Sequence, residues 1–246
     1  MNISRRIFLG GVTGCAATLW SFDPIGLDMP GSEPERGIDC LLLDLNSDCI
    51  LRESLQGYQA ALNLFPDATL NSRRRCRLAI VPAFGAMDSA IAWTLSNLLQ
   101  SGTDVLLESG AGFLSAEEFS AHQEMLDRYF DIAVGAPVDL WAGKSADDVP
   151  LRHRAGRHPG SSPDSYASIP YVNYFWPREA KVRDFSRVIP VTARAGDVIG
   201  KVGALPVALK RCTAKGTLIF LGSPLGPSLR AGDSEALSWL RMVARL

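Results

Sequence analysis

The sequence predicts an α/β fold of three layers (α/β/α), in which helices cover both faces of a mostly parallel sheet with antiparallel additions. Residues 78–81 and 105–107 are short apolar runs without polar alternation, which is typical of strands covered on both faces. Between them, apolar residues recur at the spacing of one helix face from Met87 to Leu98, and Gly102 marks the stop. Two buried strands joined by a helix must be parallel, with a right-handed crossover.

Residues 1–22 are predicted to be a targeting segment, followed by a linker over residues 23–37. The run Ser4-Arg5-Arg6-Ile7-Phe8-Leu9 precedes an apolar stretch that ends at Trp20. It resembles the twin-arginine (Tat) leader of exported bacterial proteins, with Gly10 where lysine is common. The resemblance implies that the Tat machinery reads Arg5 and Arg6 and exports the protein folded. We expect it to be periplasmic or anchored on the outer side of the inner membrane.

The end of this leader has three interpretations. Residues 12–15 resemble a lipoprotein box, which would make Cys15 a lipidated N-terminus. Cleavage near Ala16 and Ala17, or retention as an uncleaved anchor, are the alternatives. The apolar run is shorter than the roughly 18 residues that a membrane span needs.

The first buried strand is predicted at residues 38–45, and the polar residues Asp44, Asn46 and Asp48 lie at or just beyond its end. Their spacing is that of a calcium loop, but Cys49 and Leu55 occupy the positions that need Gly and Glu, so we reject that site. A helix over 51–62 follows. After the central unit, Ser115 and Glu118 form a predicted capping box, with a helix to about 129 and a strand at 131–135.

From residue 139 to about 180 the pattern changes to an irregular insertion in the domain. Its Gly-, Pro- and Ser-rich part carries His153 and His158, which we interpret as solvated because no further metal ligands stand at suitable spacing. Residues 169–177 are the most aromatic stretch. Tyr171, Tyr174 and Trp176 suit stacking on a sugar or gripping a peptide, although a strand packing its aromatics inward is the plainer interpretation.

The last third of the chain predicts antiparallel additions to the sheet. Short strands are expected at 186–191, 197–202 and 206–210, with a turn at Gly203-Ala204. A further buried strand at 217–221 ends in a Gly- and Pro-containing stretch that includes Ser223. A final helix begins after Asp233, its expected N-cap. Residues 38–246 thus form one predicted domain.

The stretches IVPAF, LLQSGTDVLLESGAG and LPVALKRCTAKGTLIFLGSPLG resemble the class I glutamine amidotransferase-like superfamily. The similarity is to its non-amidotransferase branch, which includes β-galactosidase trimerisation-type and ThuA-like domains. It implies a flavodoxin-like, amidotransferase-like sheet. Active members place a cysteine at a strand-to-helix elbow with His and Glu beside it. None of Cys40, Cys49, Cys76 and Cys212 has that setting, so the resemblance implies a member without the Cys-His-Glu machinery.

The candidate ligand site is the carboxyl edge of the sheet, where open α/β sheets place ligands. The residues expected to line it are Asp44, Asn46, Asp88, Glu108, Ser109 and Ser223, with Tyr171, Tyr174 and Trp176 as a wall. We expect a ligand-binding or interaction module of the cell envelope, with a small-molecule or envelope-protein partner. A subunit of a larger envelope assembly is a further reading, and it predicts a sizeable exposed apolar patch.

The alternative is an envelope hydrolase acting on a sugar or peptide, with Glu108 as acid/base and Ser109 or water as nucleophile. Serine chemistry would need a histidine brought close in space, and His122, His153 and His158 are the three in the chain. We expect no cofactor and no metal, because no nucleotide loop, haem site, flavin motif or ligand cluster is present. The formal net charge of −1, with one short arginine cluster before residue 78, makes nucleic acid an unlikely partner.

Overall fold

The computed structural model describes residues 38–43, 52–64, 68–70, 76–109, 113, 115–140, 170–184, 187–192, 194, 196–213 and 215–245. The helices are α1 (Arg52–Asn63), α2 (Ser89–Gln100), α3 (Ala116–Phe130), α4 (Gly226–Arg230) and α5 (Ser234–Arg245). The first strands are β1 (Ile38–Leu42), β2 (Ala68–Leu70), β3 (Leu78–Val81), β4 (Asp104–Glu108), β5 (Ala133–Val134) and β6 (Val138–Asp139). The later strands are β7 (Tyr171–Tyr174), β8 (Ala180–Arg183), β9 (Arg187–Val188), β10 (Val191–Thr192), β11 (Asp197–Val202), β12 (Leu205–Cys212) and β13 (Thr217–Leu221).

The main sheet has nine strands in the order β2-β1-β3-β4-β13-β12-β11-β7-β8. The four pairings from β2 to β13 are parallel, and the four from β13 to β8 are antiparallel. The α/β class is therefore confirmed. The mostly parallel character is not, because the antiparallel strands form half of the pairings. The predicted turn at Gly203-Ala204 joins β11 to β12, and Gly203 has the positive φ of 57° that such a tight turn requires.

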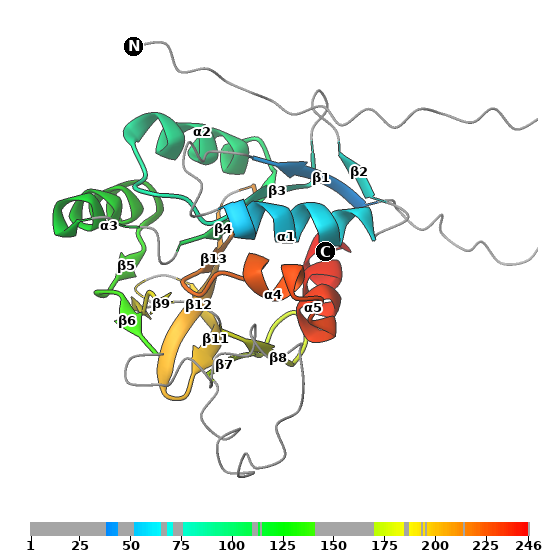
Figure 1. Ribbon diagram of the computed structural model, residues 1–246. Helices are drawn as coiled ribbons and strands as arrows, with labels where there is room; N and C mark the ends of the chain where they lie inside the picture. The colour runs from blue at the N-terminus through cyan, green and yellow to red at the C-terminus, as the bar shows by residue number, and fades with distance from the viewer. Residues whose placement is uncertain are drawn as a thin grey trace, which may run out of the picture.

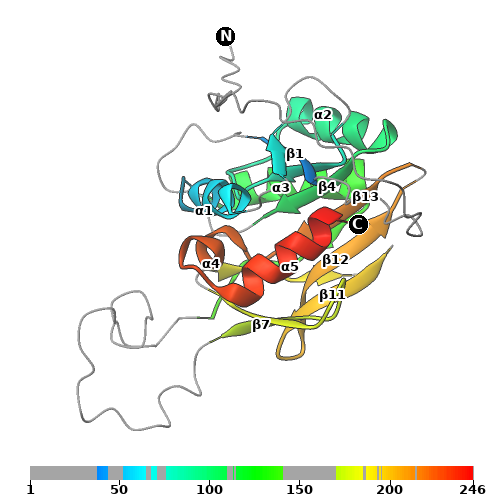
Figure 2. The ribbon, with the colours of Figure 1, turned by 90° about the vertical axis from the view of Figure 1, so that its right-hand side faces the viewer.

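Helices cover both faces of this sheet, as expected from the apolar strands. Alternate residues of β3 point to opposite sides, so Leu78 and Ile80 belong to one core and Ala79 and Val81 to the other. The first core includes buried residues of α1, α4 and α5, and the second includes those of α2 and α3. Figure 1 shows α2 and α3 set apart from α1, α4 and α5, and Figure 2 shows α5 running in front of the sheet.

Polar side chains cap three of the helices, and two of these caps, Ser115 and Asp233, were predicted from the sequence. Asp88 accepts a hydrogen bond from the Ile91 N–H at 2.7 Å and caps α2. Ser115 caps α3 by accepting from the Glu118 N–H at 3.1 Å. Asp233 accepts from the Glu235 N–H at 2.9 Å at the start of α5. Each cap fixes the residue at which its helix begins.

Several short elements differ from the sequence prediction. The strand expected at 131–135 is only β5, and the one at 186–191 divides into β9 and β10. These lie in two separate two-stranded sheets, β10 with β5 and β6 with β9, and do not extend the main sheet. The strands β2 and β8 and the helix α4 were not predicted, because segments of three to five residues are too short to show a period.

Some predicted features lie outside the described residues. They are the leader and linker at residues 1–37, Asp44 and Asn46, and residues 141–169 with His153 and His158. Within the described part, no disulfide joins Cys40, Cys76 and Cys212, of which the first two are buried. Among the described helices, none combines the length and the apolar character that crossing a membrane requires.

Candidate functional site

Glu108, the last residue of β4, lies at the centre of a buried polar cluster at the carboxyl edge of the parallel strands. Its side chain is 0% exposed. Five groups donate hydrogen bonds to its two oxygens. Two are hydroxyls, that of Ser54 and that of Tyr58, the latter at 2.5 Å. Three are backbone N–H groups, those of Ala83 at 3.0 Å, Leu225 at 2.6 Å and Gly226 at 3.0 Å. A carboxylate has about four lone-pair positions, so these donors saturate it. In this arrangement no acceptor position remains for a substrate.

Two glycines allow α1 to close over this carboxylate. A Cβ on Gly57 would overlap the carbonyl of Gly226, and a Cβ on Gly226 would overlap Ser54. The backbones of α1 and α4 therefore touch directly, which brings Ser54 and Tyr58 within reach of Glu108. This contact separates Glu108 from solvent.

Burial dominates the protonation equilibria of the cluster. Burial raises the pKa of the Glu108 carboxyl above its usual range, while the hydrogen bonds from Ser54, Tyr58, Ala83 and Leu225 oppose the rise. The pKa of Tyr58 is raised well above 10, first by burial and then by the charge of Glu108. Burial also raises the pKa of Tyr174. The tyrosines therefore stay neutral and act as hydrogen-bond donors at any physiological pH.

Ser109 follows Glu108 and meets a histidine that the sequence analysis only named as a possible neighbour. The Ser109 Oγ lies 2.7 Å from the Nε2 of His122 on α3. The other ring nitrogen, Nδ1, accepts a hydrogen bond from the Met87 N–H at 3.1 Å. Ser109 is 1% exposed and His122 is 0% exposed. The rings of Phe113 and Phe84 enclose the imidazole, at centroid distances of 4.8 and 6.1 Å.

This pair has the wrong proton arrangement for a nucleophile and its base. A backbone N–H can only donate, so Nδ1 of His122 carries no proton and a neutral ring holds its proton on Nε2. Nε2 then donates to Ser109 Oγ and cannot take the serine proton, as a general base must. Burial lowers the pKa of His122 to about 4, partly offset by the charge of Glu118, so the ring is neutral at pH 7.

The other predicted ligand residues of the carboxyl edge do not converge on an open site. Ser223 is 2% exposed and donates to Asp184 Oδ1 at 2.6 Å, and Asp184 is itself fully buried. Asp88 is exposed, and its carboxylate caps α2. Each of these described polar groups serves a hydrogen bond within the protein, so the expected ligand-lined edge is occupied by internal contacts.

The three aromatic residues do not form one wall. Positions 171 and 174 in β7 point to opposite faces of the sheet, because side chains alternate along a strand. Tyr174 is buried against Trp239 at a ring-centroid distance of 4.5 Å. Tyr171 is half-buried under the ammonium of Lys181, 4.5 Å from its ring. The plainer interpretation, a strand packing its aromatics inward, describes Tyr174.

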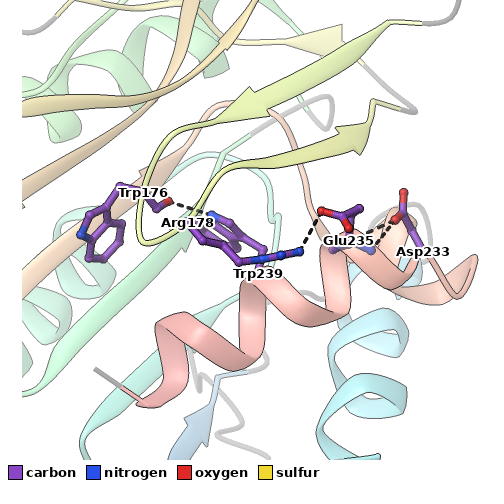
Figure 3. A network of polar contacts seen from close by, with 6 residues as sticks. Trp176, Arg178, Asp233, Glu235 and Trp239 are labelled. Carbon is purple, nitrogen blue, oxygen red and sulfur yellow. Dashed lines mark hydrogen bonds and ion pairs between the residues drawn. The ribbon is translucent and has the colours of Figure 1, made fainter.

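Trp176 joins the turn after β7 to α5. Its carbonyl accepts a hydrogen bond from the Trp239 indole N–H at 2.8 Å, and Arg178 pairs with Glu235 at 2.7 Å (Figure 3). The ammonium of Lys210 lies 4.9 Å from the Trp176 ring. These contacts fix the turn on the helix, so the half-buried Trp176 has a structural role that accounts for its position.

The sequence did not predict Ser54 and Tyr58 as donors to Glu108, nor Asp184 as the acceptor of the Ser223 hydroxyl. Tyr58 stands on the apolar face of α1, and no sequence pattern links it to a glutamate 50 residues away. His122 carried a weak signal: it lies on the buried stripe of α3 with Leu126 and Phe130, where a polar residue needs a partner. No group of three His, Cys, Asp or Glu side chains among the described residues could hold a metal ion.

Comparison with known proteins concerns the fold alone. No protein family and no curated protein matches the sequence. Among solved structures, the chain is similar to exo-β-1,4-mannosidase Op5Man5 from Opitutaceae bacterium strain TAV5, with a TM-score of 0.52 and 10% identity over 85% of this chain and 36% of that one. The β-galactosidase from Rahnella sp. R3 gives a TM-score of 0.52 and 10% identity over 85% of this chain and 31% of that one. The chain thus spans about a third of the length of these enzymes.

Proposed function

We propose that this protein is an exported, non-catalytic ligand-binding or interaction module of the cell envelope. One observation carries the proposal. Among the described residues, the acidic and nucleophilic groups at the carboxyl edge serve internal hydrogen bonds, above all the five that Glu108 accepts, and all of them except Asp88 are buried. A catalytic acid, base or nucleophile has to reach its substrate, whereas a module that acts through its surface can use such groups for stability.

We further propose an amidotransferase-like fold in a single domain over residues 38–246. In support, the parallel half of the sheet has the strand order β2-β1-β3-β4-β13, which is the 2-1-3-4-5 order of flavodoxin-like sheets. One sheet also contains strands from β1 to β13. The antiparallel strands β12, β11, β7 and β8 extend that half on one side.

Export through the Tat machinery by way of Arg5 and Arg6 belongs to the same proposal and rests on the leader sequence. The reading as a subunit of an envelope assembly has less support. Among the described residues, the large exposed apolar side chains are Leu64, Trp93, Val138, Phe175 and Met242. They lie on or beside different elements, and single exposed apolar residues are ordinary on protein surfaces.

The second candidate function is an envelope hydrolase acting on a sugar or peptide through Glu108 and Ser109. The 2.7 Å contact between Ser109 and His122 favours it, and the named activities of the similar structures would favour a sugar. At 10% identity no catalytic residue can be carried over from those enzymes. The orientation of His122 and the burial of both residues weigh against it.

An activity screen separates the two functions. The purified protein is assayed on chromogenic glycosides, esters and peptide anilides, together with Ser109→Ala, Glu108→Gln and, as a control on an exposed serine, Ser234→Ala. We expect no turnover above background in any of them. Turnover that persists in Ser234→Ala and disappears in a folded Ser109→Ala variant would establish the hydrolase instead.

A further inference from the structure

A surface depression of about 320 Å³ lies at the amino edge of the parallel strands, away from the Glu108 cluster. The ends of α2 and α3, the end of β12 and the turn that leads into β13 surround it. Ligand pockets typically measure about 300 to 1,000 Å³, so this one has room for a single small molecule. Neither the candidate site nor the proposed function uses its residues.

The wall that carries Lys215 is fixed in place. Within the turn, Thr213 N–H donates to the carbonyl of Gly216 at 2.8 Å, and Gly216 N–H donates back to Thr213 Oγ1 at 3.1 Å. Gly216 packs so closely on the α2–β4 connection that a Cβ there would come within 2.5 Å of the Thr103 carbonyl oxygen. Asp104 accepts from Thr217 N–H at 2.6 Å and ties the turn to β4. Lys215 directly precedes Gly216, which these contacts hold against the α2–β4 connection.

The opposite wall is also ordered by specific contacts. Asp131 ends α3 in the left-handed region, with φ 52° and ψ 40°, and is the one non-glycine residue with positive φ in the described part of the chain. Its carboxylate pairs with Arg211 at 3.2 Å. The same guanidinium donates to the carbonyl of Phe130. These bonds hold Arg211 against the end of α3 before any ligand arrives.

The lining carries an excess of positive charge. The lining contains one carboxylate, that of Asp131, and three cationic side chains, those of Arg128, Arg211 and Lys215. Asp131 and the Phe130 carbonyl already engage Arg211, whereas Arg128 and Lys215 are exposed and form no ion pair with a described residue. Carbonyls at the two helix ends also have hydrogen-bond donors, since Leu98 of α2 accepts from Thr103 N–H at 3.0 Å and Leu126 of α3 accepts from Ile132 N–H at 3.2 Å. Lys215 is therefore available to an anion, and so is Arg128, whose guanidinium carbon lies over the Tyr129 ring at 6.0 Å from its centroid.

We propose that this depression binds a small hydroxylated carboxylate, such as a monosaccharide acid. The cations match the carboxylate, and Ser96 and Gln100 supply side chains that hydrogen-bond to hydroxyl groups. Tyr129 adds a half-buried aromatic ring to the lining, with the Arg128 guanidinium carbon over it at 6.0 Å from the ring centroid. The inference deepens the proposed binding function, since it rests on that function for its biological setting, and it does not depend on how the protein is exported.

The test is a calorimetric titration of the full chain with D-glucuronate, D-glucose and inorganic phosphate. We expect glucuronate to bind at least about tenfold more tightly than either of the others, because only it offers both a carboxylate and hydroxyls. Lys215→Gln and Arg128→Gln should each weaken glucuronate binding about three- to fivefold, as exposed charge pairs do. Lys181→Gln removes an exposed lysine on β8 and should change it less than about twofold.

Three results would overturn the proposal: no glucuronate binding at all, equal binding of glucose or phosphate, or equal weakening by Lys181→Gln and Lys215→Gln. These outcomes are separate from failure of the proposed function. Turnover in the activity screen would refute the non-catalytic role and leave the binding test intact. If neither turnover nor glucuronate binding is observed, this binding site is rejected and the proposed non-catalytic role is retained.

Discussion

At the scale of single residues, His122 makes stability depend on pH. Its folded pKa is about 4 and the unfolded value is about 6.5, so the unfolded chain binds the proton more readily between these values. Because folding lowers the pKa of His122, the contribution of this group to the free energy of unfolding is complete above pH 6.5 and is lost as the pH falls toward 4. We expect the free energy of unfolding to drop by about 2 to 3 kcal/mol from this group between pH 7 and 4.5.

The measurement is urea denaturation of the parent and His122→Gln at both pH values. The charge of Glu118 on α3 and the raised pKa of the nearby buried Glu108 act in the opposite direction, and both are present in the two proteins. The difference between the proteins therefore isolates His122. An identical loss of stability in the variant would show that another group titrates.

Glu108 gives a second prediction at this scale. Glu108→Gln preserves the shape but turns one acceptor into an NH₂ group that faces donors. We expect a loss of about 3 kcal/mol, because buried hydrogen-bond donors are left without an acceptor. Ser54→Ala removes only one of the five donors and should cost about 1 kcal/mol. Chemical denaturation checks the order, and an equally stable Glu108→Gln would refute the saturated carboxylate.

At the scale of elements, the contact between α1 and α4 depends on Gly57. Gly57→Ala improves helix propensity by up to about 1 kcal/mol, yet its methyl group would overlap the backbone of Gly226. Since two backbones cannot give way easily, we expect a net loss of about 2 to 3 kcal/mol. The exposed neighbour Gln56→Ala should stay within about 0.5 kcal/mol of the parent. Thermal denaturation of both variants tests this, and a stabilised Gly57→Ala would contradict the close contact.

The elements also show what a sequence can predict. The buried strands β3, β4 and β13 were predicted from short continuous apolar runs, α2 from the spacing of its apolar face and α3 from its capping box, all of which are local signals. Antiparallel additions were predicted, but not that they form half of the pairings, because a pairing such as β7 with β11 joins segments distant in the chain. The same reason explains the site: Glu108 was placed at a strand end, but Ser54, Tyr58 and Leu225 reach it only through tertiary packing. The opposite orientation of Tyr171 and Tyr174 could have been derived from strand alternation.

At the scale of the whole molecule, the leader predicts the route of export. Replacing both Arg5 and Arg6 by lysine keeps the charge but removes the pair that the Tat receptor reads. We expect the full-length precursor to stay in the cytoplasm, as judged by cell fractionation and immunoblotting. Arg36→Lys, in the predicted linker, should leave export unchanged. Normal export of the double variant would point to the general secretory route.

The carboxylate of Glu108 has a consequence for how the molecule opens. Its donors come from α1, from the segment after β3 and from the start of α4. Three parts of the chain are therefore hydrogen-bonded to the same carboxylate. None of them can fray without breaking bonds to a buried charge. The amide protons of Ala83, Leu225 and Gly226 should therefore exchange with solvent deuterium only when the whole domain unfolds. Amide protons in loops usually exchange early, so slow exchange at these three positions would place them in the most stable part of the domain.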